Sequence, residues 1–235
     1  MTDKKAAIYH FTDESTKRPN IYIKQIRALE SYGMSLGYEI VDIFCDKSLL
    51  RYQRNEFDRL ISISEEYDAI ICKDYYHISK NTMQCMKIVS NLNKKGVNII
   101  TLENGFINLQ ESPPFHLPLK IATYYSRFGL ESKFNNISDV NNEILRLFTE
   151  KKTIWTLLDQ FTDERESQKE CELISLREML ANANKYDLIL TNSFSDIHWR
   201  TASFFRIRNQ LQLDMYSLQE GFIKEKRGNP NDICR

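Results

Sequence analysis

Short runs of β-branched and aromatic residues alternate with stretches of helical periodicity through the first hundred residues. This pattern predicts strands at 5–11, 38–45, 67–74 and 97–102, and helices after Pro19, at 54–66 and from Met83 to Leu92. The middle of the third run is apolar throughout, as in a strand that is covered on both faces. Such alternation is typical of an α/β domain with a mainly parallel sheet and flanking helices.

The pattern changes after Asn108. Residues 108–120 hold three of the five prolines, which cannot continue a helix or a central strand, so this stretch predicts a connection. A helix is predicted at 119–133, and another from Ser138 or Asp139, as N-cap, to Glu150.

An internal repeat extends across the chain. Phe-Thr-Asp-Glu occurs in "IYHFTDEST" (8–16) and again in "LLDQFTDERES" (157–167), and residues 67–92 align with 186–211 without a gap. Residues 100–107 then align with 216–223 in the same order. The interval from the tetrapeptide to the Tyr-Asp pair is shorter in the second copy, by about a helix and a strand. The repeat therefore predicts a full α/β unit followed by a smaller, trimmed copy at 152–235.

Charge and cysteine content exclude several classes of protein. Lys plus Arg equals Asp plus Glu at 32 each, so no overall positive field draws the chain to nucleic acid or to an anionic membrane. Five scattered cysteines without a C-x-x-C pair predict buried thiols rather than a disulfide framework or a zinc site. Without a leader pattern or a membrane-length apolar run, the sequence predicts a cytoplasmic protein with no membrane partner. No motif predicts a cofactor or a metal.

Several motifs of the first unit resemble the catalytic domain of the serine recombinases, the resolvase and invertase family. The family's opening strand ends in Tyr-x-Arg-Val-Ser-Thr and precedes Gln-x-x-x-Leu, and "AAIYHFTDEST" and "KQIRAL" stand in these places. Its third-strand signature, roughly Lys-Asp-x-x-Arg-x-x-Arg-Asn, resembles "KDYYHISKN" (73–81), and "KKGVNIITLENG" (94–105) resembles its fourth strand. The resemblance implies that the predicted helix at 119–133 is the family's long helix, used for dimer contacts and for reaching DNA.

The departures from the family pattern fall on the chemistry. These enzymes attack a DNA phosphodiester with a serine hydroxyl, and arginines stabilise the charge of the transition state. Asp13 stands at the nucleophile's place and Phe11 at the place of the first arginine. His77 and Lys80 replace two later arginines, so that only Arg54 keeps its family identity. The resemblance thus implies a degenerate site without a catalytic residue, in which Arg54, His77 and Lys80 bind DNA phosphate.

Other interpretations stay open. Shifting the alignment by two residues places Ser15 on the family's serine, which would give an active enzyme with a phosphoserine-DNA intermediate. His77 and Lys80 are equally consistent with ordinary solvated groups at a helix start. Tyr75 and Tyr76 are interpreted as packing residues, with base stacking as the alternative.

The preferred hypothesis is a resolvase-like domain at 1–134, a helical connection at 135–151 and a degenerate second unit at 152–235. It would be a catalytically inactive member of a recombination system that binds DNA, an active serine recombinase or further copies of itself. A second alternative is a protein-interaction module unrelated to DNA, because a fold does not dictate a function.

Overall fold

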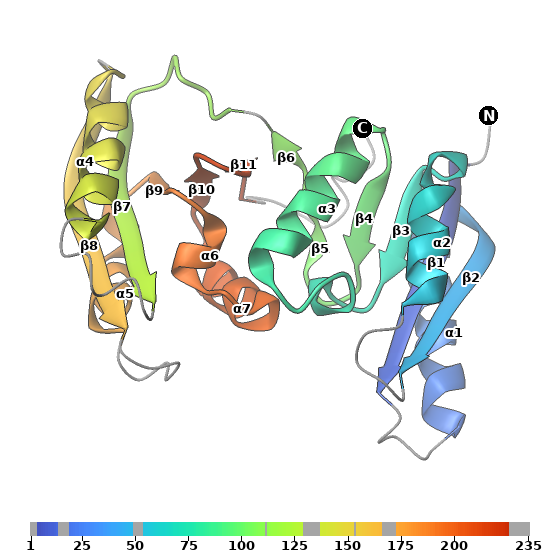
Figure 1. The fold of residues 1–235 in the computed structure, drawn as a ribbon. Coiled ribbons are helices and arrows are strands. Elements are labelled where there is room, and N and C mark those ends of the chain that lie inside the picture. Colours follow the sequence, from blue (N-terminus) through green and yellow to red (C-terminus); the bar gives the residue numbers. More distant parts are fainter. Residues whose placement is uncertain are drawn as a thin grey trace. The chain divides into compact units, whose positions relative to one another are not determined.

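The computed structural model describes residues 4–13, 19–48, 54–110, 112–128, 137–152, 154–165 and 173–225. Contacts divide the chain into two compact units (Figure 1). The first unit holds the described residues up to Lys80 together with Lys87–Asn108. The second holds Asn81–Met86 together with the described residues from Leu109 to Glu225.

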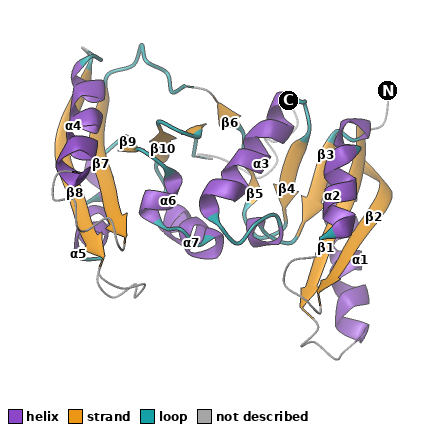
Figure 2. Ribbon diagram, in the orientation of Figure 1, coloured by secondary structure: helices purple, strands orange, loops and turns teal. Residues whose placement is uncertain are grey.

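The first unit is built on a five-stranded sheet in the order β2-β1-β3-β4-β5 (Figure 2). The first four strands are parallel to their neighbours, and β5 pairs antiparallel with β4. The elements are β1 (Lys4–Asp13), α1 (Pro19–Ser35), β2 (Tyr38–Ser48), α2 (Asn55–Ser62), η1 (Ser64–Glu66), β3 (Ala69–Cys72), η2 (Tyr75–His77), α3 (Thr82–Lys94), β4 (Asn98–Thr101) and β5 (Gly105–Phe106). The strands and helices predicted for the first hundred residues are therefore confirmed.

The core of the first unit explains why these segments form strands. Residues 69–72 of β3 are all buried, as a strand covered on both faces requires. Ile26 and Leu29 of α1 pack against Ala6 and Ile8 of β1. A Cβ at Gly33 would lie 2.6 Å from the Ile71 side chain, so the glycine lets α1 approach the sheet closely.

The second unit has a six-stranded sheet in the order β6-β11-β10-β9-β7-β8. Strands β7 to β10 pair in parallel, and β11 and β6 add antiparallel pairs at one edge. The elements are β6 (Leu109–Gln110), β7 (Leu119–Phe128), α4 (Ile137–Glu150), β8 (Trp155–Arg165), α5 (Ile174–Ala181), η5 (Ala183–Lys185), β9 (Leu188–Thr191), α6 (Phe194–Ile197), α7 (Thr201–Leu211), β10 (Asp214–Ser217) and β11 (Gly221–Ile223).

Apart from β6, the second unit has the strand order of the first, so the prediction of a trimmed copy is wrong. β8-β7-β9-β10-β11 corresponds to β2-β1-β3-β4-β5, and the helices follow in the same sequence. The shared tetrapeptide misled the alignment. Phe11, Thr12 and Asp13 end β1, whereas Phe161 lies in β8, the counterpart of β2. The aligned segments 67–92 and 186–211 do occupy equivalent elements.

The helix predicted at 119–133 is also wrong, because residues 119–128 form strand β7. All side chains from Ile121 to Ser126 are buried, which suits a central parallel strand and leaves no polar helical face. The segment predicted as a helical connection is α4, whose Leu145 packs against Ile121 and Trp155 of its own unit. The division between the units consequently lies near Leu109 and not at residue 134.

No helix within the described ranges combines the length and the apolar character needed to cross a membrane.

Candidate functional site

Asp46, a buried carboxylate at the carboxyl end of β2, connects three elements of the first unit. Its Oδ1 accepts a hydrogen bond from the backbone N–H of Glu56 (3.1 Å), and its Oδ2 accepts one from Phe57 (2.9 Å). The Tyr9 hydroxyl of β1 donates to the same Oδ2 at 3.0 Å. The first N–H groups of a helix have no partner within the helix, and their partial positive charge favours an anion. Asp46 therefore fixes the start of α2 to the sheet.

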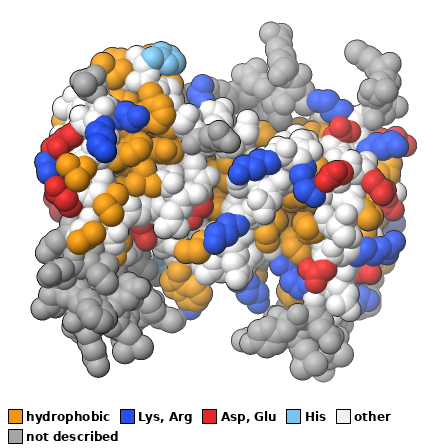
Figure 3. Space-filling view, turned by 45° about the horizontal axis from the view of Figure 1, so that its top comes forward, with side chains coloured by type: hydrophobic (Ala, Val, Ile, Leu, Met, Phe, Trp, Pro, Cys, Tyr) orange, Lys and Arg blue, Asp and Glu red, His pale blue; other side chains and the backbone are white. Residues whose placement is uncertain are grey.

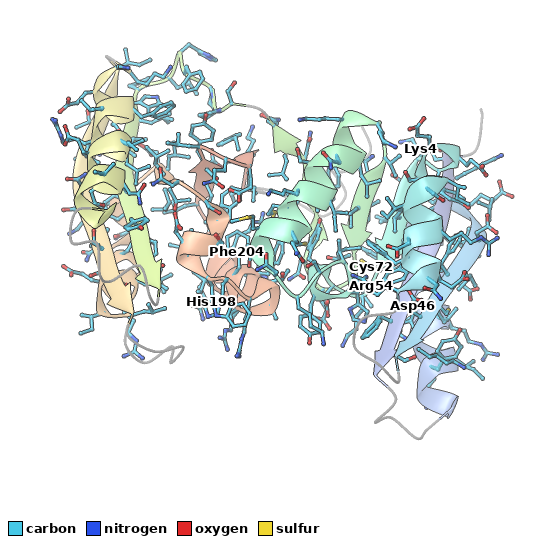
Figure 4. The ribbon with its side chains drawn as sticks, viewed as in Figure 1. Lys4, Asp46, Arg54, Cys72, His198 and Phe204 are labelled. Carbon is cyan, nitrogen blue, oxygen red and sulfur yellow. The ribbon has the colours of Figure 1, made fainter. Side chains whose placement is uncertain are left out.

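Arg54 lies near Asp46 (Figure 4), and its guanidinium donates hydrogen bonds to groups of the protein itself. Its Nε and Nη2 donate to the Tyr9 hydroxyl at 3.1 and 3.0 Å. Nη2 also donates to the carbonyl of His77, and Nη1 donates to the carbonyl of Ile78. The planar group stacks on Phe57, with 4.0 Å from Cζ to the ring centroid. Arg54 thus clamps β1 and α2 to the turn that follows β3.

Burial raises the pKa of the Tyr9 phenol, although the charge of Arg54 acts in the opposite direction. The hydroxyl therefore stays protonated and can donate to Asp46 while it accepts from Arg54.

His77 and Lys80 lie on the same turn but differ in their surroundings. Asp74 Oδ1 contacts His77 Nδ1 at 2.8 Å and accepts from the His77 backbone N–H at 3.1 Å. Burial alone would raise the pKa of the Asp74 carboxyl, but the bonds and charge of His77 lower it below its usual value. Lys80 is exposed, and its ammonium lies 6.0 Å from the centroid of Phe11 and 5.2 Å from that of Tyr76. Of the three predicted phosphate ligands, Lys80 offers its charge most directly to solvent.

No sequence motif indicates a role for His10, yet its side chain is buried at this edge, and within the described part of the chain neither ring nitrogen has a hydrogen-bond partner. Its ring lies 5.4 Å from Tyr22 and 5.9 Å from His77, between centroids. Burial, followed by the nearby His77 and Lys73, lowers the pKa of His10 to about 4. The ring is therefore neutral at neutral pH.

The second unit repeats the carboxylate arrangement. Asp163, at the end of β8, accepts from the backbone N–H groups of Ser175 and Leu176 in α5, each at 2.9 Å. The Tyr124 hydroxyl of β7 donates to Asp163 at 2.9 Å. This triad has the connectivity of Tyr9, Asp46 and the start of α2. The tetrapeptide repeat hides this correspondence, because it pairs Asp163 with Asp13 and not with Asp46.

The second unit differs where the first has Arg54. Leu173 precedes α5 at the position that Arg54 holds before α2. The carbonyl of Asp196, the residue equivalent to His77, accepts a hydrogen bond from the Ser126 hydroxyl of β7. A serine in one unit and an arginine in the other thus satisfy the same backbone carbonyl. The two contacts hold the turn after β3 and the turn after β9, respectively.

The structure describes only some of the other predicted site residues. Ser15 and the side chain of Asp13 lie outside the described residues, so their roles stay predictions. Phe11 occupies the site edge, where Arg54 Cζ lies 6.0 Å from its ring centroid. Within the described ranges, no cluster of three or more His, Cys, Asp or Glu side chains has a geometry suited to a metal ion.

Comparison with known proteins finds similarity to resolvases over part of the chain. Residues 15–128 match the family model described as "Resolvase, N terminal domain". A "Resolvase" from Clostridium perfringens (strain 13 / Type A) is 26% identical over 94 residues, which are 40% of this chain and 48% of that protein. The chain spans about half the length of this curated relative.

Two solved structures give a weaker likeness. The N-terminal catalytic domain of TP901-1 integrase is 21% identical, with 43% of this chain and 79% of that chain covered and a TM-score of 0.38. A resolvase family site-specific recombinase from Streptococcus pneumoniae is 16% identical, with 64% and 96% covered and a TM-score of 0.35. Residues 15–128 of this chain are therefore similar in sequence to the resolvase N-terminal domain family.

Proposed function

We propose that this protein is a catalytically inactive relative of the serine recombinases that acts in DNA recombination by binding DNA or an active recombinase. The family match supports the link to recombination. The inactivity and the binding role are inferred from the residues at the site edge.

The state of Arg54 carries the proposal. A catalytic arginine must point its donors at the phosphate, but three nitrogens of Arg54 already donate to Tyr9, His77 and Ile78. Phe11 supplies an apolar ring where the family has an arginine. The surviving family arginine thus stabilises the fold, and the transition-state charge would have no matching fork of donors.

The second unit offers no replacement. At the positions of Arg54, His77 and Lys80 it has Leu173, Asp196 and Trp199. None of these side chains is a cation, so a phosphoryl group bound there would find no matching charge. The duplicated unit fits a binding role better than a second active site.

Lys80 is the residue best placed to contact a DNA phosphate. Wild-type protein is expected to retain generic duplex DNA weakly, with an affinity that falls as salt rises. A plot of the logarithm of the binding constant against the logarithm of the salt concentration has a negative slope. In Lys80→Ala this slope should be smaller in magnitude by about one, because one phosphate contact is lost. Lys87, an exposed lysine within α3, provides the matched control, and Lys87→Ala should leave the slope unchanged. Gel shifts over a salt series measure both, and equal slopes for all three proteins would remove Lys80 from the interface.

A protein partner requires a different surface from the one predicted, because the expected dimer helix is strand β7. Figure 3 shows hydrophobic side chains gathered on the surface of the second unit. Val140, Ile144 and Leu147 of α4 are exposed by 54%, 44% and 43%, and their spacing forms one stripe along the helix. An exposed apolar stripe of this kind is typical of a protein contact, and it supports the recombinase-binding part of the proposal.

A further inference from the structure

Each unit presents an aromatic side chain beside a cation at the turn before α3 or α7. In the first unit, Tyr76 is 38% exposed and the Lys80 ammonium lies 5.2 Å from its ring centroid. The preceding Tyr75 is fully buried and donates its hydroxyl to the carbonyl of Ile99 at 3.1 Å. Tyr75 therefore packs in the core, whereas Tyr76 belongs to the surface.

The second unit forms a similar pair from different positions. Trp199 is half-buried, Arg200 is exposed, and the guanidinium carbon lies 4.8 Å from the Trp199 ring. The gapless alignment places Trp199 on Lys80 and puts Ser195 where the first unit has Tyr76. The aromatic residue and the cation thus occupy different aligned positions in the two units. In both units, however, an aromatic residue next to a cation lies on the turn before the helix. Packing alone does not require this, because the buried counterparts Tyr75 and Phe194 already fill the core.

We propose that these two aromatic–cation pairs are stacking platforms for unpaired bases of single-stranded DNA. A partly exposed ring offers its face to any base, and the adjacent cation can neutralise the backbone phosphate. Bases inside a duplex are stacked on each other and do not reach such rings, so the chemistry favours a single strand. The inference rests on the proposed DNA-binding function and adds the form of the DNA that is bound.

Tryptophan emission provides a direct test. The chain holds two tryptophans, of which Trp155 is buried, so Trp155→Phe leaves Trp199 as the sole reporter. Adding an oligothymidylate should quench the emission of this variant, because the base stacks on the indole. Binding of a labelled oligothymidylate to the otherwise wild-type chain, read by anisotropy, should weaken about tenfold in Trp199→Ala and in Tyr76→Ala, the range of one lost stacking contact. Lys87→Ala and Arg177→Ala control for general loss of positive charge and should change the affinity less than about twofold.

The outcomes separate this inference from the proposed function. Quenching of the Trp199 emission, together with weaker oligothymidylate binding in Trp199→Ala and Tyr76→Ala, supports the platforms. Retention of duplex DNA with no quenching, and with unchanged affinity in Trp199→Ala and Tyr76→Ala, would overturn the platforms while leaving the proposed function in place. Failure to retain either form of DNA would overturn the platforms together with the DNA-binding part of the proposed function.

Discussion

Asp46→Ala is expected to lower the free energy of unfolding of the first unit by about 4 kcal/mol. The substitution leaves the Tyr9 hydroxyl and the N–H groups of Glu56 and Phe57 without their acceptor. Each such bond to a charged group contributes roughly 1.5–3 kcal/mol, and donors left buried and unpaired are costly. Urea unfolding of the full chain, with hydrogen exchange of the β1 and α2 amides, measures the effect.

The duplication supplies an internal replicate for this prediction. Asp163→Ala removes the equivalent acceptor from Tyr124, Ser175 and Leu176, and should destabilise the second unit by a similar amount. Asp58→Ala, in the first turn of α2 but exposed, is the matched control and should cost less than about 0.5 kcal/mol. A loss below about 1 kcal/mol in both Asp46→Ala and Asp163→Ala would show that the carboxylates do not hold the helices.

The second large effect is a fall in the free energy of unfolding at acidic pH, caused by His10. In the folded protein the pKa of His10 is lowered to about 4, whereas an unfolded histidine titrates near about 6.5. Between these values the unfolded chain binds a proton that the folded chain does not. The stability is thus complete above pH about 6.5 and falls as the pH drops toward about 4, by on the order of 3 kcal/mol.

His10→Leu isolates this contribution from that of the carboxylates. The substitution removes two buried nitrogens that have no hydrogen-bond partner, so the variant should equal or exceed the wild type in stability at pH 7. Its stability should also decline less between pH 6.5 and pH 4, since the proton uptake is gone. Urea unfolding across that range compares the two proteins. Parallel pH profiles would contradict the buried, neutral assignment of His10.

Periodicity predicted the local structure of the first unit well because each segment shows its own pattern. The run "YDAIICKD" is apolar in its centre and becomes buried β3, and Met86, Val89 and Leu92 become the buried side of α3. The same reasoning failed at β7. There, "KIATYYSRF" carries Ala122, Thr123 and Ser126, small or polar residues whose burial depends on strands paired from distant parts of the chain. Because residues 119–128 were predicted as a helix, the first strand of the second copy was missing from the predicted repeat.

The site was predictable in position but not in role. Parallel strands bring their carboxyl ends together, so the proximity of Arg54 to the turn at His77 followed from the fold resemblance. The direction of the Arg54 donors, toward backbone carbonyls and Tyr9, depends on tertiary geometry that no spacing reveals. The Asp46 acceptor has a weak sequence signal, a carboxylate near the end of a strand and about ten residues before a helix, which recurs at Asp163. Only the matched topology shows that the two signals are the same feature.

The most direct test of catalytic inactivity is covalent trapping on DNA. The protein is incubated with supercoiled DNA that carries candidate sites from its own genomic neighbourhood, quenched in detergent, and examined for DNA-linked protein. An active serine recombinase on its own site runs in parallel as the positive control. The account predicts no linked species while the control forms one. A linked species that disappears in Ser15→Ala would contradict it and identify Ser15 as the nucleophile.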